Sequence, residues 1–306
     1  MDGLLVIDKP VGLTSHDVVA RMRRVLGERR IGHTGTLDPN ASGVLPLVIG
    51  RATRLAKFLS GGNKTYDAVV QFGVATDTYD AEGTPVGAAW AGPPPTREEI
   101  ERALAEFRGT FLQQPPAYSA KKIDGERSYT AARANRAAPP ALAPVEVTVH
   151  RLDLVGVHGE QATLMVECSA GFYVRSLAHD LGARLGVGAH LAALRRTVSS
   201  GLTLDDAMPL EFAERSREDA LEAVRPMESM LPELGEVVLT DEGLLHAIHG
   251  RNISAAEVAS GAPGSPGRSG RHANDHVRLV DELGQLVGIG EPTGIPGVLH
   301  PSVVLR

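Results

Sequence analysis

The stretch "GHTGTLDPNASGVLPLVIG", residues 32 to 50, joins a polar loop to an apolar run. Asp38 is its only carboxylate, five residues after His33 and surrounded by Gly, Thr, Ser and Pro. An Asp before a Pro is typical of a helix N-cap or an Asx turn, because its side chain accepts backbone N–H bonds. The Gly-Lys-Ser/Thr ending of a phosphate-binding loop is absent. The stretch alone leaves a structural and a chemical role for Asp38 open.

Length and composition predict a folded, soluble protein. The chain has 306 residues, of which 42% are hydrophobic, enough for one large domain and a smaller one. Its longest apolar runs are far shorter than the roughly 20 residues that cross a bilayer, and no signal peptide opens the chain. We therefore expect a cytoplasmic protein without membrane association. Cys168 is the only cysteine, which excludes intramolecular disulfides and cysteine-rich zinc sites.

Charge is distributed unevenly along the chain, although the net charge is -6. Residues 1–57 carry nine Lys and Arg against five Asp and Glu, or +4, whereas residues 211–260 carry four against eleven, or -7. A positive N-terminal part can attract phosphates, although the same pattern is also typical of a solvated helix face.

Short strands and helices alternate along the first part of the chain. Residues 3–10 and 65–74 read as strands, and residues 14–27 read as a helix with Thr14 as N-cap and Asp17 at the third position. Thr96 and Glu99 form a second capping box. Residues 162–186 read as a strand, a turn and a helix, with Arg175 where the helix begins.

Two further segments differ in character from this part. Residues 113–140 lie between proline pairs and predict a protruding basic flap, or else an ordinary surface helix with loop ends. The segment carries five cations, Arg136 and four here called the flap cations, which are Lys121, Lys122, Arg127 and Arg133. Residues 233–306 predict a small β-rich domain with strands near 236–240, 277–282, 286–291 and 298–305, interrupted by a flexible Gly/Ser/Pro-rich insertion at 260–271. Residues 1–232, which include the flap, would then form the larger N-terminal domain.

Metal binding is not expected from the sequence. The pairs His246/His249 and His272/His276 have metal-like spacing, but neither has a cysteine nearby, and the second lies in or beside the insertion.

Five ordered motifs carry a family resemblance over nearly the whole chain. They are "GHTGTLDPNASGVLPLVIGRATR", "KTYDAVVQFGVATDTYDAEG", "PPAYSAKKIDGERSYTAAR", "CSAGFYVRSLAHDLG" and "GAHLAALRRT". In order and spacing they resemble the bacterial tRNA pseudouridine synthase B family, and the tail is similar to that family's RNA-binding PUA domain. The glycine-rich insertion and a very short N-terminus depart from the family pattern and concern RNA binding more than chemistry.

The resemblance implies isomerisation of uridine 55 in the T arm of tRNA to pseudouridine, with no cofactor or metal. It implies that Asp38 is the catalytic carboxylate, which must be ionised, and that Arg175 is the cation that favours its charge. Tyr66 matches a tyrosine for which two tasks are open, stacking on the base alone or also taking the C5 proton, although a strand tyrosine is more often a core residue. Because the uridine lies in a folded loop, it must be extruded before it reacts.

The remaining site residues also follow from the resemblance. His33 matches a histidine that assists extrusion of the base, and Tyr173 and Leu194 match positions that line the uridine pocket. Asp80 either organises the site or caps a turn, and Lys9 lies in the matching "DKP" turn.

The predicted fold is α+β, with a mixed, largely antiparallel sheet flanked by helices and a small C-terminal PUA-like β domain. We expect a monomer that binds tRNA without an obligate protein partner. Two alternatives stay open, a guide-RNA-dependent pseudouridine synthase subunit and a non-catalytic tRNA-folding chaperone that would not need Asp38.

Overall fold

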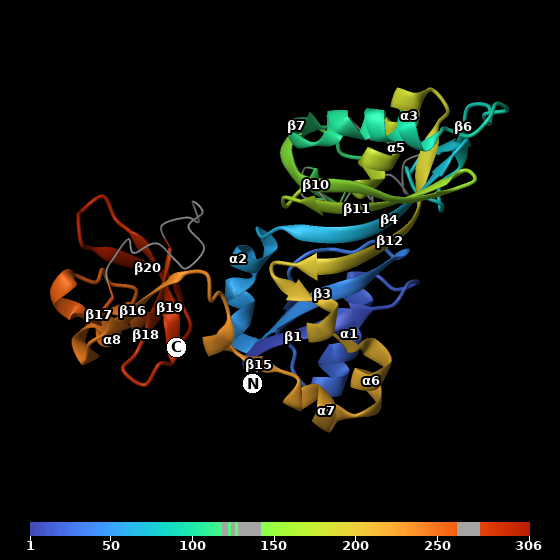
Figure 1. Cartoon of the computed structure of the whole chain (residues 1–306). Helices are drawn as coiled ribbons and strands as arrows, with labels where there is room; N and C mark the ends of the chain where they lie inside the picture. The colour runs from blue at the N-terminus through green and yellow to red at the C-terminus, as the bar shows by residue number, and fades with distance from the viewer. Residues whose placement is uncertain (118–121, 124–125, 128–141, 262–275) are drawn as a thin grey trace.

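The computed structural model describes residues 1–117, 122–123, 126–127, 142–261 and 276–306. Two sheets of unequal size organise these residues (Figure 1). The large sheet carries the N-terminal part and most of the helices, and the small sheet belongs to the C-terminal part. The predicted α+β class is confirmed.

The large sheet is mixed and mostly antiparallel. Its main path runs in the order β14-β1-β3-β12-β4-β11-β10-β7, and β2, β13 and β15 pair at its margins. Within the path, β1 pairs with β14 and β12 pairs with β3 in parallel, whereas the other neighbours are antiparallel. Its strands are β1 (Gly3–Lys9), β2 (Ile31–His33), β3 (Ala41–Ile49), β4 (Lys64–Phe72), β7 (Gly109–Gln113), β10 (Val145–His158), β11 (Gln161–Cys168), β12 (Ala189–Ser199), β13 (Leu202–Thr203), β14 (Met208–Pro209) and β15 (Arg225–Pro226).

Strand β3, the apolar run that follows the Asp38 loop, is buried on both faces. Leu45 and Leu47 face the core under helix α1 (Ser15–Leu26), and Val44 and Val48 face a second core on the other side. Successive side chains of a strand point to opposite faces, so a run without polar interruptions fits a strand covered on both sides. This central strand anchors the C-terminal end of the Asp38 loop.

Helix α1 begins and ends where the sequence predicts. Thr14 Oγ1 accepts a bond from the Asp17 backbone N–H at 3.0 Å, and Asp17 Oδ2 accepts one from the Thr14 N–H at 2.9 Å. Gly27 ends the helix with φ of 70°, a left-handed conformation that favours glycine. The buried face of α1 carries Val18 and Met22, which cover the sheet.

The other half of the sheet is covered by α3 (Arg97–Leu104) and α5 (Val174–Leu185). Ile100 and Leu104 of α3 share one core with Leu177 and Leu181 of α5 and with strands β4, β10 and β11. The predicted capping box at Thr96 is present. The remaining short elements of this part are α2 (Ala56–Ser60), α6 (Leu210–Arg215), α7 (Arg217–Glu222), the hairpin β5 (Ala75–Thr76) and β6 (Pro85–Val86), and the pair β8 (Lys122–Ile123) and β9 (Glu126–Arg127).

The C-terminal sheet has the order β17-β16-β18-β19-β20. Its strands are β16 (Gly235–Leu239), β17 (Val258–Ser260), β18 (Val277–Val280), β19 (Leu286–Pro292) and β20 (Leu299–Val304). The four predicted strands match β16, β18, β19 and β20. Helix α8 (Asp241–Ile248), capped by Thr240, was not predicted, because the sequence there was interpreted only as short strands. Residues 262–271 of the insertion lie outside the described residues.

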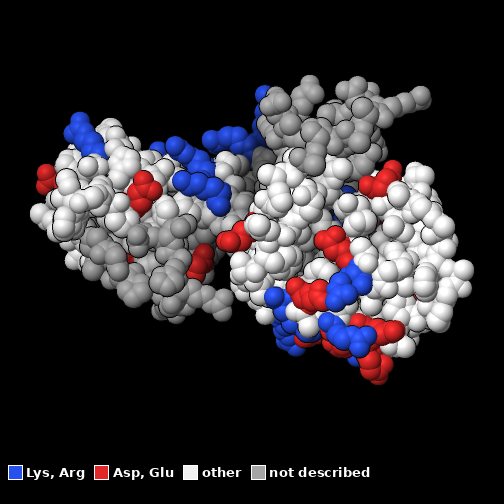
Figure 2. Space-filling view, turned by 90° about the horizontal axis from the view of Figure 1, so that it is seen from above, with Lys and Arg blue, Asp and Glu red and all other residues white. Residues whose placement is uncertain are grey.

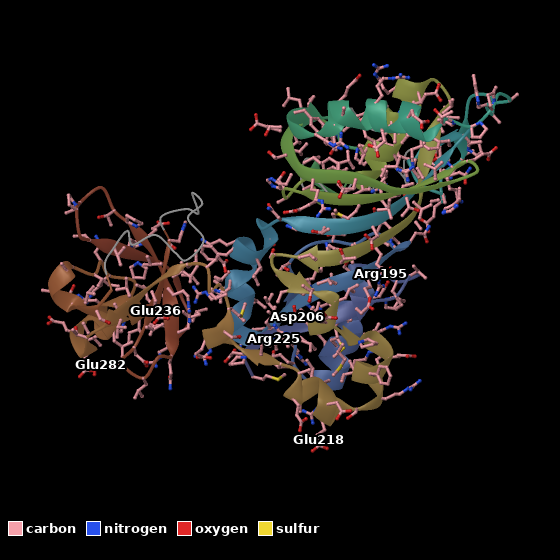
Figure 3. The ribbon with its side chains drawn as sticks, in the orientation of Figure 1. Arg195, Asp206, Glu218, Arg225, Glu236 and Glu282 are labelled. Atoms are coloured by element: carbon pink, nitrogen blue, oxygen red, sulfur yellow. The ribbon has the colours of Figure 1, made fainter. Side chains whose placement is uncertain are left out.

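The two parts share an apolar core. Leu4 of β1 and Val48 of β3 belong to the same buried cluster as Leu286, Ile289 and Val303 of the C-terminal sheet. The ion pair between Arg225 and Asp206, 2.6 Å apart, ties the segment that leads to this junction to the large sheet (Figure 3). No described helix combines the length and apolar character needed to cross a membrane.

Candidate active site

Three adjoining cavities meet at Asp38 and Arg175. The first has a volume of about 250 Å³ and lies between the Asp38 loop, β4, β12 and the start of α5. The second, of about 230 Å³, opens between Asp38 and the segment from Asp77 to Thr84. The third is a small space of about 20 Å³ beside Leu194. A carboxylate and a guanidinium common to all three mark this region as the candidate active site.

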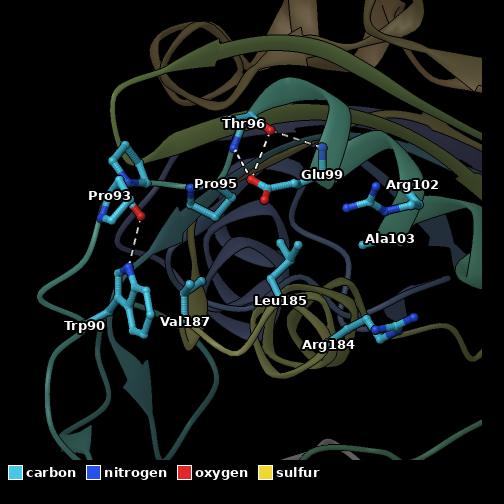
Figure 4. A pocket seen from close by; sticks show the side chains of 11 residues that line it. Trp90, Pro93, Pro95, Thr96, Glu99, Arg102, Ala103, Arg184, Leu185 and Val187 are labelled. Carbon is cyan, nitrogen blue, oxygen red and sulfur yellow. Dashed lines mark hydrogen bonds between the residues drawn. The ribbon is translucent and has the colours of Figure 1, made fainter.

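A larger cavity, of about 420 Å³, lies elsewhere, between α3 and the end of α5 (Figure 4). Its acid, Glu99, is occupied as the cap of α3, since Thr96 donates to it from both its backbone N–H and its hydroxyl. Arg184 pairs with Glu106 at 2.6 Å. Trp90, which is 46% exposed, donates its indole N–H to the Pro93 carbonyl. These groups already serve the local structure, so volume alone does not identify the site.

Asp38 and Arg175 form an ion pair. Arg175 Nε lies 3.0 Å from Asp38 Oδ2, and the Arg175 side chain is 9% exposed whereas that of Asp38 is 43% exposed. The carboxylate therefore reaches into the open cavity while its cation is held in the wall. A charge-assisted bond of this length holds the carboxylate in a fixed direction.

The loop that carries Asp38 is fixed by backbone bonds. Ser15 Oγ accepts from the Leu37 N–H at 2.8 Å and donates to the Leu37 carbonyl at 3.1 Å. The turn at Asp38 closes through its own carbonyl, which accepts from the Ala41 N–H at 3.0 Å. Within the described residues the Asp38 carboxylate thus pairs with Arg175 rather than with a turn N–H, and the side chain faces the cavity.

Lys9 supports this loop from behind. Its side chain is fully buried, and Nζ donates to the carbonyls of Leu13 at 2.6 Å, Pro10 at 2.9 Å and Pro39 at 3.4 Å. Burial lowers the pKa of the Lys9 ammonium from 10.5 to about 8, while the charge of Asp38 raises it. Lys9 lines none of the three cavities at Asp38, so we place it beneath the site.

The first turn of α5 positions Arg175. Tyr173 is the N-cap of this helix, and the Gln113 side chain of β7 clamps its backbone, accepting from the Tyr173 N–H at 2.8 Å and donating to its carbonyl at 3.0 Å. Ser176 Oγ donates to the Gln114 carbonyl at 2.8 Å. The helix start is therefore tied to β7, which fixes the direction in which Arg175 leaves the helix.

Asp80 performs both of the roles that the sequence left open. Its Oδ1 accepts from the Thr78 hydroxyl at 2.6 Å and from the Glu82 N–H at 3.1 Å, which closes the turn. Its Oδ2 lies 3.4 Å from Arg175 Nη1, which also donates to the Thr78 carbonyl at 3.2 Å. Arg175 therefore bridges Asp38 and the Asp80 turn.

Tyr66, Tyr173 and Leu194 line the first cavity together with Asp38 and Arg175. Tyr66 lies on β4 and Leu194 on β12, and both are half-buried against the apolar cores. Burial raises the pKa of the Tyr66 hydroxyl, and the nearby charge of Arg196 lowers it. The five residues come from four separate motifs of the family resemblance, and the structure places all five around one cavity.

His33 ends β2, where it pairs with Leu47, and does not line these cavities, although its neighbour Thr34 does. Of the flap cations, Lys121 and Arg133 lie outside the described residues. Lys122 and Arg127 are opposite each other in β8 and β9, and their side chains are not described.

Two buried cations of the first cavity were not predicted. Arg196 is 1% exposed and Lys64 is 6% exposed. Lys64 Nζ donates to the carbonyls of Ser60 at 2.5 Å and Gly62 at 2.6 Å, and burial lowers its pKa to about 8. A buried cation on a strand breaks the apolar pattern in the same way as a surface residue, so periodicity gives no signal for it.

His246 and His276, one from each of the histidine pairs with metal-like spacing, form ion pairs with glutamates in the C-terminal part. His246 lies beside Glu257, with Nδ1 2.6 Å from Oε1, and Glu242 is the third member of that cluster. His276 pairs with Glu291 at 3.3 Å, and His272 lies outside the described residues. Because Glu257 also caps η5 (Ala255–Glu257) by accepting from the Ser254 N–H at 2.6 Å, these contacts hold the C-terminal part together.

Comparison with known proteins identifies similar chains over the full length. Residues 23–174 match the TruB family pseudouridylate synthase (N terminal domain), and residues 175–232 match the tRNA pseudouridylate synthase B C-terminal domain. The chain is 46% identical to tRNA pseudouridine synthase B of Solibacter usitatus (strain Ellin6076) over 307 residues, which is 100% of both chains. It is 38% identical to that of Aquifex aeolicus (strain VF5), also over 100% of both.

Solved structures with the same fold include the Cbf5 proteins. The Cbf5-Nop10-Gar1 complex matches with a TM-score of 0.72 and 27% identity, covering 98% of this chain and 84% of that chain. The archaeal box H/ACA sRNP Nop10-Cbf5 complex matches with a TM-score of 0.72 and 25% identity, covering 99% and 86%.

Proposed function

This chain belongs to the TruB family of pseudouridylate synthases, and from that premise we propose that its target is the uridine at position 55 in the T arm of tRNA. The relatives of this chain are named tRNA pseudouridine synthase B, so the activity of the family is the isomerisation of uridine in tRNA to pseudouridine. We further propose that the protein acts as a monomer, without metal, cofactor, guide RNA or protein partner, in the cytoplasm.

In this proposal Asp38 is the catalytic carboxylate. The reaction breaks the bond between N1 of uracil and C1′ of ribose, turns the uracil while it is held and forms a bond from C5 to C1′. C5 releases its proton and N1 takes one up, so the product is an isomer of the substrate. An ionised acid is needed whether it attacks the base, attacks the ribose or first removes a ribose proton. The ion pair with Arg175, at 3.0 Å, supports this assignment because it holds the carboxylate in a fixed direction at the mouth of a cavity.

The first cavity would receive the extruded uracil. Tyr66 offers a ring for stacking, and Leu194 and Tyr173 complete the apolar part of the wall. We assign His33 to the extrusion step, since it precedes the wall residue Thr34 along the chain. Base-modifying enzymes pay for unstacking their target with such contacts.

The tRNA backbone would lie against exposed cations beside this cavity. Figure 2 shows Lys and Arg side chains gathered near the junction of the two parts of the molecule. Exposed cations of the first 57 residues include Arg29, Arg30, Arg54 and Lys57. Together with the flap cations and the C-terminal part, which we propose to be a PUA-like RNA-binding domain, they offer phosphate contacts.

The observation that carries the proposal is the convergence of Asp38, Arg175 and Tyr66 on one cavity. The substitution Asp38→Asn tests it, because the amide has nearly the same shape but no charge. We expect pseudouridine formation to disappear and tRNA binding to persist or tighten slightly. Asp67→Asn, on the exposed side of β4, is the matched control and should keep the parental rate.

Binding that is lost together with activity in folded Asp38→Asn protein would show that Asp38 serves the loop structure instead. Binding of unmodified tRNA without any product from the parent protein would favour the chaperone alternative, and product only after addition of a guide RNA would favour the guide-dependent alternative. Circular dichroism establishes that each variant is folded.

A further inference from the structure

Arg196 is a buried cation in the wall of the candidate active site. It lies on β12 beside Arg195, but the two side chains leave opposite faces of the strand. The side chain of Arg195 is 40% exposed and pairs with Asp8 at 2.7 Å (Figure 3). Arg196 is 1% exposed and lines the cavity that also holds Asp38 and Tyr66. Two adjacent residues of one type thus occupy opposite environments.

The guanidinium of Arg196 connects three elements around the cavity. Its Nε donates to the Val44 carbonyl of β3 at 2.7 Å, and its Nη2 donates to the Gly35 carbonyl of the Asp38 loop at 3.1 Å. Arg196 is also the cross-strand partner of Tyr66, and both side chains line the first cavity. One planar group therefore binds the loop and the central strand and lies beside the tyrosine.

The burial of the Arg196 guanidinium is unfavourable for the stability of the fold. Among the described residues, no Asp or Glu forms an ion pair with Arg196, and its electrostatic partner is the neutral Tyr66 hydroxyl. Burial lowers the pKa of Arg196 for this reason. Burial of a cation without an anionic partner is unfavourable, whereas an apolar residue at the same place in the sheet would not carry this desolvation cost.

The space around Arg196 leaves little freedom for the loop. A methyl group on Gly35 would lie 3.3 Å from Arg196 Nη1, which is tighter than an ordinary contact. Glycine at residue 35 lets the loop backbone approach the guanidinium without this tight contact. Gly35 is three residues before Asp38, so a shift of the guanidinium would also shift the loop that carries Asp38.

We propose that Arg196 is a positioning residue for the isomerisation, which holds the Tyr66 hydroxyl and the Gly35 end of the Asp38 loop in one arrangement around the uracil. It does not touch the reacting atoms and acts through Tyr66. This inference rests on the proposed function, since it assigns a task to a residue beside the cavity in which the base would react. Arginine suits the task because its fork of donors fixes direction as well as charge.

A double-mutant cycle tests the dependence on Tyr66. We expect Tyr66→Phe to lower the single-turnover rate at saturating tRNA by on the order of 100-fold, as removal of a group that takes part in proton transfer does. Arg196→Met should lower it by about tenfold or more. In the Tyr66→Phe background, Arg196→Met should cost less than about threefold, because the hydroxyl that it positions is already gone. If the fold losses in rate of the two single variants multiply in the double variant, the two residues act independently and the proposal is wrong.

A second measurement separates this proposal from the proposed function. A fluorinated tyrosine at position 66 has a more acidic phenol, which brings its titration into an accessible pH range. The charged and titratable groups that act on Tyr66 are Arg196, Cys168 and Asp38. Loss of the cation in Arg196→Met should raise the pKa of this phenol by about one unit or more. An unchanged titration in folded protein would also overturn the proposal.

Arg195→Met is the matched control and should change neither the rate nor the titration, because Arg195 lines none of the cavities at Asp38. If Arg196→Met does not fold, the same titration and rate are measured on Arg196→Lys instead. Lysine keeps the charge without the fork, so we expect a near-parental titration and a reduced rate, and a fully parental rate would contradict the positioning role. If the parent forms no pseudouridine, the proposed function fails while the titration still reports on the contact.

Discussion

Replacement of Lys9 by methionine should change the stability of the protein in a pH-dependent way. Lys9 is fully buried beneath the Asp38 loop, and burial lowers its pKa from 10.5 to about 8. Between these two values the unfolded chain binds more protons than the folded chain, so the free energy of unfolding rises with pH. Below pH 8 both states carry the charged ammonium, and its burial then opposes folding in full.

The size of the effect follows from the two pKa values. From pH 7 to pH 10, the lysine term adds about 2.5 kcal/mol to the free energy of unfolding of the parent, at about 1.36 kcal/mol for each pH unit in which only the folded state has lost the proton. The methionine variant lacks this term. It also loses the three bonds to the carbonyls of Pro10, Leu13 and Pro39, and the part of that loss that changes with pH is already contained in the pKa of Lys9. The stability difference between the two proteins should therefore grow by about 2.5 kcal/mol.

Urea unfolding of both proteins at pH 7, 8, 9 and 10, followed by circular dichroism, measures this difference. Lys57→Met, on the exposed side of α2, is the control, and its difference from the parent should stay constant. A constant difference for Lys9→Met as well would refute the reasoning, because it would mean that the ammonium is solvated in the folded protein.

Three further outcomes are expected. Arg175→Met removes the cation 3.0 Å from Asp38, so the single-turnover rate at saturating tRNA should fall; a parental rate in folded protein would show that Arg175 does not support Asp38. Charge reversal of the four flap cations should weaken tRNA binding and flatten its dependence on log salt, whereas an unchanged slope would show that they contact no phosphates. Burial raises the pKa of the Cys168 thiol to about 12, so a thiol reagent should label the native protein at neutral pH far more slowly than the urea-unfolded protein; equal rates would contradict this.

Much of the fold could be predicted from local chemistry. The capping boxes at Thr14 and Thr96 specify the starts of α1 and α3 through bonds within four residues, and both are present. Strands β1, β4 and β11 and the strands of the C-terminal sheet follow from their apolar patterns. Helix α8 could not be separated from its neighbouring strands by pattern, because the helix is short and its sequence is mostly apolar.

The site was predictable as a set of residues rather than as a geometry. Asp38, Tyr66 and Arg175 come from different motifs, and the family resemblance alone brought them together, since no local spacing relates β4, α5 and the loop. The dual role of Asp80 depends on a 3.4 Å approach to Arg175.

The burial of Lys9 and Arg196 depends on long-range packing, and neither could be inferred from a sequence in which lysine and arginine are normally exposed. The contrast between Arg195 and Arg196 arises only from the face of β12 that each residue occupies.

Release of tritium from T-arm RNA labelled at uracil C5 tests the central claim most directly. Formation of the bond between C5 and C1′ expels the C5 hydrogen, so each uridine that is isomerised releases one tritium. We expect the purified protein to release one tritium per target uridine without added metal, nucleotide, guide RNA or partner protein. Absence of release from an unmodified tRNA that demonstrably binds to the protein would contradict the assignment of Asp38 and its cavity to this reaction.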